Sequence, residues 1–307
     1  SITPLAKDDI NKPEFALLVV LALVGMMLMI SANDLMSLYM AVELQSLPLY
    51  VVAAMRTNSL RSSEAGLKYF LLGALSSGML LYGASLVYGF AGTTSFSGIA
   101  AAVSVDQLPV AFIVGMVFMV SGIAFKISAA PFHMWTPDVY QGSPTPVTAF
   151  MASVGKIAAL VSLVRVFVVA FPSRSDDWGI VVFVLSALTL VVGSVVAIVQ
   201  TNIKRMLAYS SISHAGFILV GLEAASHSDS VNAGDGLVAV GVYVVLYAAL
   251  VVGTFGVVSV VARNTNEDAT SLDAFKGLAK NQPLLGLVNL LFVGCWLSCF
   301  LQVQFLN

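Results

Sequence analysis

Long, nearly uninterrupted apolar runs constrain this chain more than any other feature of its sequence. A helix that crosses about 30 Å of hydrocarbon needs roughly 20 apolar residues. A membrane β-strand needs about 10 residues of alternating polarity, and these runs lack that alternation. Only 10% of the residues are charged and 59% are hydrophobic, whereas a typical soluble domain carries about 25% charged residues. The sequence therefore predicts an all-α integral membrane protein.

The runs delimit about nine expected membrane helices joined by short polar connections. They lie near residues 15–30, 35–55, 62–88, 109–140, 145–171, 178–201, 203–222, 235–262 and 283–305. Connections of at most about 20 residues leave no room for a soluble catalytic domain. A net charge of −2 gives no basic surface for nucleic acid. The two cysteines, Cys295 and Cys299, are too few for a disulfide framework or a thiolate metal site.

The fourth run differs from the others because it contains helix-breaking residues and a charge. Pro131 and Pro137 lie inside it, shortly after Lys126. Proline removes a backbone donor and clashes with the preceding turn. In a bilayer such a break is tolerated only where it is buried in protein or lines a wet cavity. We therefore expect a discontinuous helix with Lys126 at the break.

Lysine and arginine residues predict the orientation of the chain in the membrane. If the connections alternate sides, Arg174 is alone on one side. The side that bears the N-terminus holds Lys7, Lys12, Arg56, Arg61, Lys204, Arg205, Arg263, Lys276 and Lys280. This asymmetry satisfies the positive-inside rule, so the N-terminal side is expected to face the cytoplasm or the mitochondrial matrix.

Three ionisable residues fall deep inside expected helices: Glu43, Lys126 and Lys156. Each would cost about 2.5–3.5 kcal/mol at the bilayer centre if it were unpaired. Lys156 lies about 16 Å along its helix at 1.5 Å per residue, near the midplane. Two interpretations remain open, a structural ion pair plus a satisfied lysine, or a proton relay. The relay is favoured, since desolvation lets a buried lysine exist as a neutral amine that binds and releases a proton.

Other polar residues within the runs have competing explanations. Lys68 lies near a helix end and four residues after Glu64, so snorkelling or an i,i+4 pair would explain it as well as a relay. Arg165 is better explained by snorkelling, because arginine does not give up its proton. His133 is equally compatible with a relay and with an aromatic interface contact, whereas for His214 we favour a structural contact.

Several long motifs in this chain resemble one known family. They are Glu43-Leu44-Gln45-Ser46-Leu47, Glu64-Ala65-Gly66-Leu67-Lys68-Tyr69-Phe70, Phe125-Lys126 through Thr136-Pro137-Asp138-Val139-Tyr140, Gly142-Ser143-Pro144-Thr145-Pro146-Val147, Lys156-Ile157 and Lys204-Arg205-Met206-Leu207-Ala208-Tyr209-Ser210-Ser211-Ile212-Ser213-His214. In this order they are similar to subunit 2 of respiratory complex I, the proton-pumping NADH:ubiquinone oxidoreductase. The resemblance runs from about Phe15 to Pro283.

The resemblance implies an antiporter-like subunit with inverted five-helix repeats, each containing a broken helix. An N-terminal segment (1–14) would precede a first repeat (15–171) and a partial second repeat (178–307). By resemblance, Glu43 pairs with Lys126, Lys156 is the central relay lysine, and Lys68 and His133 belong to the same polar axis. The chain would bind no cofactor, because FMN, iron–sulfur clusters and ubiquinone belong to other subunits. The expected partners are the lipid bilayer and the other membrane-arm subunits.

Two departures from the family pattern bear on function. By resemblance, we expect the chain to lack about three helices that usually precede the position of Phe15, and residues 284–307 carry no lysine where the family has a terminal relay lysine. We therefore expect a second polypeptide to complete the C-terminal half. A cation/proton antiporter subunit and a structural bundle that has lost pumping are the alternatives. Because residue 1 is Ser, we expect a processed leader or a piece of a larger ancestral protein, and a mitochondrial inner membrane rather than the bacterial plasma membrane.

Overall fold

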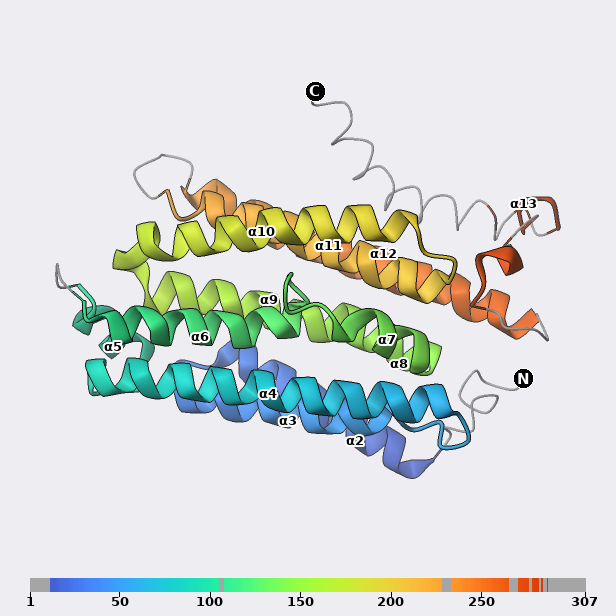
Figure 1. The fold of residues 1–307 in the computed structure, drawn as a ribbon, viewed down its shortest axis with the longest axis horizontal. Helices are drawn as coiled ribbons and strands as arrows, with labels where there is room; N and C mark the ends of the chain where they lie inside the picture. Colours follow the sequence, from blue (N-terminus) through green and yellow to red (C-terminus); the bar gives the residue numbers. More distant parts are fainter. Residues whose placement is uncertain are drawn as a thin grey trace, which may run out of the picture.

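The chain forms a bundle of long helices in the computed structural model (Figure 1). The structure describes residues 12–104, 108–227, 233–264, 270–275, 278–281, 283 and 286. Within these residues, eight helices are long and apolar enough to cross a membrane, which confirms the all-α membrane fold. The ninth expected helix, residues 283–305, lies almost entirely outside the described residues.

The helices form three groups stacked across the bundle (Figure 1). The first group contains α2 (Pro13–Ser31), α3 (Leu35–Ala53) and α4 (Leu60–Ala91). The middle group contains α5 (Phe96–Ala102), α6 (Val110–Ile127), α7 (Trp135–Gly142), α8 (Thr145–Phe150) and α9 (Lys156–Arg165). The third contains α10 (Ser175–Ile198), α11 (Ile203–Ala224) and α12 (Ala233–Asn264), and a short α13 (Leu278–Asn281) follows.

Local sequence signals set several helix ends. Asp34 caps α3 by accepting a hydrogen bond from the backbone N–H of Ser37, at 2.8 Å. Ser59 and Asn202 cap α4 and α11 in the same way. Side chains of this kind satisfy the free N–H groups of a first helical turn. Gly92 ends α4 with a left-handed φ of 67°, which glycine adopts without steric cost.

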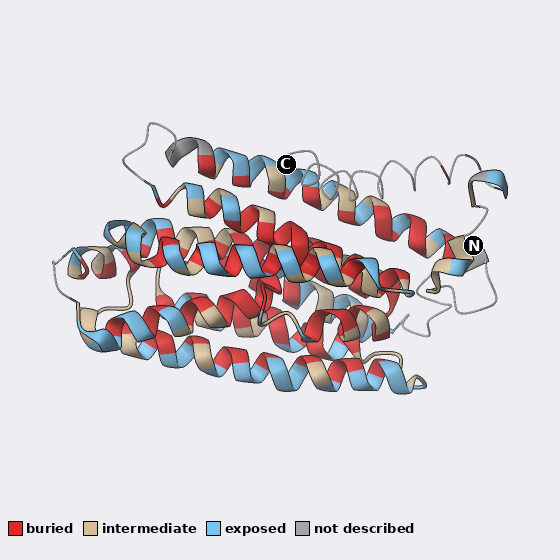
Figure 2. Ribbon diagram, turned by 45° about the horizontal axis from the view of Figure 1, so that its top comes forward, coloured by how far each residue is buried: buried red, intermediate tan, exposed pale blue. Residues whose placement is uncertain are grey.

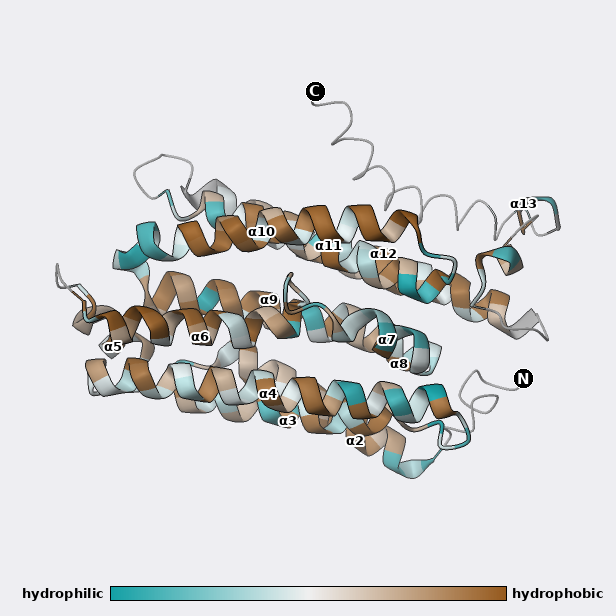
Figure 3. Ribbon diagram, in the orientation of Figure 1, coloured by the Kyte–Doolittle hydropathy of each residue, from teal (hydrophilic) through white to brown (hydrophobic). Residues whose placement is uncertain are grey.

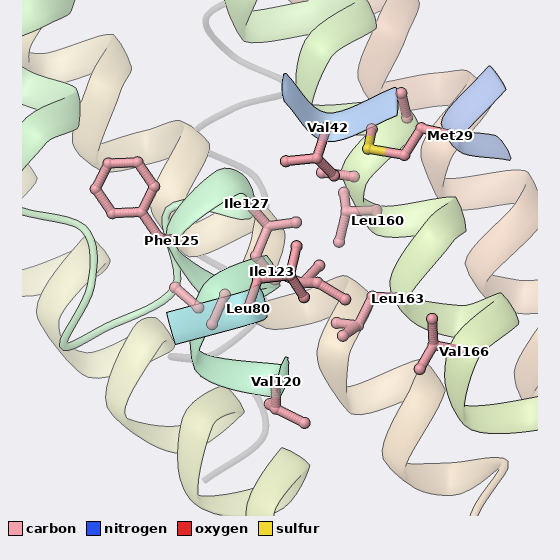
Figure 4. Packing of buried hydrophobic residues seen from close by; sticks show 14 of the residues in the cluster. Met29, Val42, Leu80, Val120, Ile123, Phe125, Ile127, Leu160, Leu163 and Val166 are labelled. Atoms are coloured by element: carbon pink, nitrogen blue, oxygen red, sulfur yellow. The ribbon is translucent and has the colours of Figure 1, made fainter. Parts of the chain in front are cut away.

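Apolar side chains occupy both the interior and the outer surface of the bundle. Met29, Val42, Ile123, Leu160 and Leu163 pack together where α2, α3, α6 and α9 meet (Figure 4). Exposed residues lie on the outer faces of the outlying helices (Figure 2). Most of those residues are hydrophobic, whereas hydrophilic residues gather where α4 and α11 begin and around α7 and α8 (Figure 3). A helix that is apolar all round is expected when lipid covers its outer face.

The fourth expected helix is broken, as the sequence predicts. Its first half, α6, ends with Lys126 in the last turn, and Ser128 adopts a left-handed φ of 62°. The backbone N–H of Ala129 closes this end by bonding to the carbonyl of Ala124 at 2.9 Å. The second half, α7, begins at Trp135.

The fifth expected helix, 145–171, contains two irregularities that its sequence does not reveal. A π-helical turn covers Met151–Gly155, directly before Lys156, and a second covers Val166–Ala170. A π-helical turn shifts the backbone register within an otherwise regular helix and occurs frequently at functional sites.

Candidate functional site

The amine of Lys126 is buried and bound by two hydroxyl groups of α3. It donates to Ser46 Oγ at 2.7 Å and to Tyr50 OH at 3.2 Å. It also lies 5.6 Å from the centroids of the Tyr50 and Phe125 rings, within cation–π range. Lys126 itself is only 6% exposed. The broken helix therefore holds this lysine against α3 through polar but uncharged partners.

The expected direct pair between Glu43 and Lys126 is not formed. Among the described residues, no carboxylate lies within 4.0 Å of the Lys126 amine. Ser46 and Tyr50 follow Glu43 by three and seven residues, so all three share one face of α3. The amine lies level with the two hydroxyls, further along the helix, and Glu43 itself is partly exposed. The Glu43 carboxylate is therefore not a direct partner of the Lys126 amine.

The amine of Lys156 is the more deeply buried of the two, with the residue 1% exposed. It donates to Ser211 Oγ on α11 at 2.6 Å and lies 5.8 Å from the centroid of the Tyr140 ring. The Ser211 hydroxyl in turn donates to the carbonyl of Ala208 at 2.9 Å. In the described part of the chain this lysine, too, has no carboxylate within ion-pair distance.

Aromatic rings connect the surroundings of the two lysines. The Tyr50 ring meets the Tyr69 ring edge-on, with 4.7 Å between their centroids, and Tyr69 stacks on Trp135 with 4.5 Å between the centroids. Trp135 contacts Tyr140 edge-on at 6.4 Å. Its indole N–H also donates to the carbonyl of Phe125 at 2.9 Å, which ties α7 back to the end of α6. This series of rings therefore runs from Tyr50, which binds Lys126, to Tyr140, which lies beside Lys156.

Lys68 belongs to a separate charged network at the membrane end where α4 begins. It pairs with Glu64 at 2.7 Å, as the i,i+4 spacing predicts, and with Asp138 of α7 at 2.7 Å. Asp138 also accepts from Arg205 of α11 at 2.5 Å. A cavity of about 140 Å³ adjoins this network, with Gln141 in its lining. The Lys68 side chain is 41% exposed, unlike those of the two buried lysines.

The sequence did not single out Asp138 or Arg205 for this network. Arg205 lies in the first turn of α11, as the expected helix 203–222 implies, but the sequence counts it only toward the charge asymmetry and gives it no partner. Lys204 beside it is 3% exposed and donates to the carbonyl of Ser143 at 2.8 Å. Asp138 follows a proline in the second half of the broken helix. The signal available in the sequence for this network was Asp138 itself, an acidic residue within the short polar segment that forms α7.

Among the hydrogen bonds of the described residues, none joins His133, His214 or Arg165 to the amine of Lys126 or Lys156. His133 is half-buried between α6 and α7, and its ring lies 6.4 Å from that of Tyr209. His214 is buried, and its Nδ1 lies 2.7 Å from Tyr243 OH, which fits the structural contact favoured from the sequence. Arg165 donates to the Ala32 carbonyl at 3.1 Å at a helix end.

The fold and the site define a class of protein, namely a multi-pass helical membrane protein with lysines buried at and beside a broken helix. The chain belongs to the NADH:quinone oxidoreductase/Mrp antiporter membrane family, whose sequence profile matches residues 32–301. This confirms the family resemblance of the motifs.

Known proteins agree with this assignment. NADH-quinone oxidoreductase subunit N of Jannaschia sp. is 50% identical over 289 residues, which are 94% of this chain and 58% of the relative. A chain of respiratory complex I from Thermus thermophilus, solved with bound aureothin, aligns with a TM-score of 0.73 and 39% identity over 90% of this chain and 57% of that one. A chain of an archaeal membrane-bound sulfane sulfur reductase aligns with a TM-score of 0.79 and 25% identity over 94% and 60%.

These comparisons also bear on length and location. The chain spans a little under three fifths of the Jannaschia relative, 58% of its length. Curated relatives that this chain matches are bacterial, for example those of Jannaschia and Rhizobium meliloti. They support a multi-pass protein of the bacterial plasma membrane, the alternative in the sequence analysis. The expectation of a mitochondrion is not supported.

Proposed function

We propose that this chain is a proton-translocating part of the membrane arm of an NADH:quinone oxidoreductase. The observation that carries the proposal is the pair of buried amines, Lys126 and Lys156, each held by hydroxyl groups. A charged amine inside a membrane protein is costly unless it is stabilised, and such residues commonly mark proton paths. In this role the subunit moves protons while electron transfer takes place elsewhere in the complex.

Hydroxyl partners suit a group that must gain and lose a proton. A hydroxyl accepts a hydrogen bond from an ammonium and donates one to a neutral amine, so it can partner both protonation states. A carboxylate at the same distance would hold the ammonium form in place, because opposite charges favour each other strongly at low dielectric. The surroundings of Lys126 and Lys156 therefore favour reversible protonation.

Within this proposal the other assignments follow the family. Lys126 and Lys156 are relay groups, and Glu43 acts on Lys126 from the face of α3 that carries Ser46 and Tyr50. Lys68 and His133 belong to the path by which protons reach the relay. Residues 15–171 form one antiporter-like repeat and 178–307 part of a second. FMN, iron–sulfur clusters and ubiquinone reside in other subunits, and a further polypeptide supplies the remaining part of the second repeat.

The test uses the assembled complex in proteoliposomes, with protons pumped per electron as the measured quantity. Lys156→Met and Lys126→Met remove the titrating amine but keep an unbranched apolar chain, and we expect both to lower this ratio. Lys280→Met is the control, because Lys280 is exposed in α13. An unchanged ratio for Lys156→Met in an intact complex would contradict the proposal and favour a structural bundle.

A cation/proton antiporter subunit is the second candidate, since the matching family includes Mrp antiporters. The two functions differ in what drives proton movement. Sodium-driven proton uptake by vesicles that contain the protein, in the absence of NADH and quinone, would favour the antiporter. Uptake that requires NADH oxidation would favour the oxidoreductase.

A further inference from the structure

The break between α6 and α7 exposes backbone donors inside the bundle. Ser128, Ala129 and Ala130 are each at most 2% exposed. The N–H groups of Ser128 and Ala129 bond back to carbonyls in the last turn of α6, at 3.1 and 2.9 Å. Pro131 has no N–H, so the last donor of this stretch is that of Ala130. An unpaired N–H in a membrane interior is costly, so this donor needs a partner from another part of the chain.

The partner of this donor is a threonine of α10, in the third group of helices. The Ala130 N–H donates to Thr189 Oγ1 at 2.9 Å, although the two residues are 59 apart in the sequence. The segment between α6 and α7 extends toward α10 (Figure 1). The Thr189 hydroxyl donates its own hydrogen to the Leu185 carbonyl in the preceding turn. Because that hydrogen is already used, the fully buried hydroxyl serves the break as an acceptor.

Close to this contact, α10 is packed tightly on α11. Gly193 lies one turn after Thr189, and a Cβ there would come 2.6 Å from the backbone nitrogen of Ser213. Such small residues allow the backbones of two helices to approach closely. The hydroxyls of Ser194 and Ser213 add a hydrogen bond at 3.2 Å. The bond to Thr189 therefore fixes Ala130 relative to two closely packed helices.

A short stretch of backbone joins this contact to Lys126, which lies in the last turn of α6 four residues before Ala130. Two other hydrogen bonds close the break: Thr136 donates to Ser128 Oγ at 2.7 Å, and the Trp135 indole donates to a carbonyl at the end of α6. Both connect parts of the broken helix with each other, so they set its shape. The bond to Thr189, in contrast, sets where the break lies in the bundle.

We propose that Thr189 is a positioning residue that holds the backbone of the break and thereby keeps the Lys126 amine against Ser46 and Tyr50. This inference rests on the proposed function, in which Lys126 gains and loses a proton. Thr189 exchanges no proton itself. Without its hydroxyl the Ala130 N–H loses its acceptor, and the break shifts toward another one. The Lys126 amine then leaves the geometry in which the two hydroxyls of α3 bind it.

Substitutions at position 189 separate the hydroxyl from the rest of the side chain. Thr189→Val keeps the branched shape and removes the hydroxyl, whereas Thr189→Ser keeps the hydroxyl and removes the methyl group. Thr189→Ala also removes the hydroxyl and favours the helix, so it repeats the test if valine impairs assembly. Thr254→Val in α12 is the matched control, because Thr254 is buried and its hydroxyl also donates to the preceding turn, at 2.8 Å.

The variants are compared in the assembled complex for protons pumped per electron, with Lys126→Met as the reference. We expect Thr189→Val to show most of the loss that Lys126→Met shows, Thr189→Ser to restore pumping, and Thr254→Val to pump as wild type does. A threonine with a merely structural role would lower thermal stability and leave the ratio of the intact complex unchanged. A loss that Thr189→Ser shares would contradict the proposal, because serine retains the acceptor.

Hydrogen–deuterium exchange of the peptide that contains residues 128–130 gives a readout besides pumping. We expect faster exchange in Thr189→Val than in wild type and no change in Thr254→Val. Unchanged exchange in Thr189→Val would overturn the proposal even if pumping fell, since the hydroxyl would then not act through Ala130.

The reference variant separates this inference from the function on which it rests. If Lys126→Met lowers pumping while Thr189→Val in an intact complex does not, the positioning role is overturned and the proposed function stands. If Lys126→Met also pumps normally, the proposed role of Lys126 fails, and the positioning role fails with it.

Discussion

The serines that bind the two lysines offer a sharp test of how the site is held together. Ser46 accepts from Lys126 at 2.7 Å and Ser211 accepts from Lys156 at 2.6 Å. A hydrogen bond to a charged group contributes about 1.5–3 kcal/mol. Each serine also lies inside a helix, where alanine is favoured by up to about 0.7 kcal/mol. We therefore expect Ser46→Ala and Ser211→Ala each to lower the free energy of unfolding by about 1–2.5 kcal/mol.

Ser121 of α6 is the matched control for this measurement. Its hydroxyl donates to the Val117 carbonyl at 2.8 Å, just as that of Ser46 donates to the Val42 carbonyl at 2.5 Å. Such bonds to the preceding turn add little and slightly disfavour the helix. Ser121→Ala should therefore change the free energy of unfolding by less than about 0.5 kcal/mol. SDS-induced unfolding of the full-length protein in mixed micelles measures all three variants.

The reasoning would be refuted if Ser46→Ala and Ser121→Ala had the same effect. That result would mean that the lysine amine finds an equally good partner once the hydroxyl is removed. A larger effect of Tyr50→Phe than of Ser46→Ala would also contradict it, because the Tyr50 hydroxyl lies farther from the amine, at 3.2 Å.

Three further perturbations test other parts of the structure. Gly25→Ala places a Cβ 2.4 Å from the backbone nitrogen of Gln45, so it should lower the free energy of unfolding by about 1–3 kcal/mol. An unchanged free energy of unfolding would show that α2 and α3 are not closely packed there. Asp138→Asn should weaken the contact with Arg205 by about 0.5–2 kcal/mol, measured as the coupling in a double-mutant cycle with Arg205→Gln, and additive effects would argue against the pair. Asp34 accepts hydrogen bonds from the hydroxyl and the backbone N–H of Ser37, and these hold the pKa of Asp34 below its usual value of 3.8. Its capping contribution, about 1 kcal/mol, should therefore be present above pH 3.8 and be lost as pH falls through the lower folded-state pKa; unfolding of wild type and Asp34→Ala should converge at low pH, and a constant difference would exclude the charge as the cause.

The sequence predicts those parts of the structure that depend on local chemistry. Apolar run length predicts the eight described membrane helices, because each helix must match the thickness of the hydrocarbon. The break after Lys126 is predictable because Pro131 cannot continue a regular helix and lies inside an apolar run. The pair between Glu64 and Lys68 is also predictable, because residues four apart are neighbours on a helix.

The partners of the buried lysines depend on tertiary packing and could not be predicted in this way. Ser46 and Lys126 are 80 residues apart, and Lys156 and Ser211 are 55 apart. Nothing in the sequence distinguishes these serines from the many others that pack between membrane helices. The expected pair of Glu43 with Lys126 came from the family resemblance and not from the residues themselves.

Lys68 has a different kind of partner from Lys126 and Lys156, and depth in the bundle separates it from them. At the end where α4 begins, Lys68 is 41% exposed and pairs with the carboxylates of Glu64 and Asp138. Water screens such pairs, so they add little energy and can rearrange. In the interior, a carboxylate would hold the ammonium form strongly. Loss of the lysine's proton would then leave the carboxylate as an uncompensated buried charge. Hydroxyl groups at Lys126 and Lys156 stabilise the amine without that consequence, as the proposed proton relay requires.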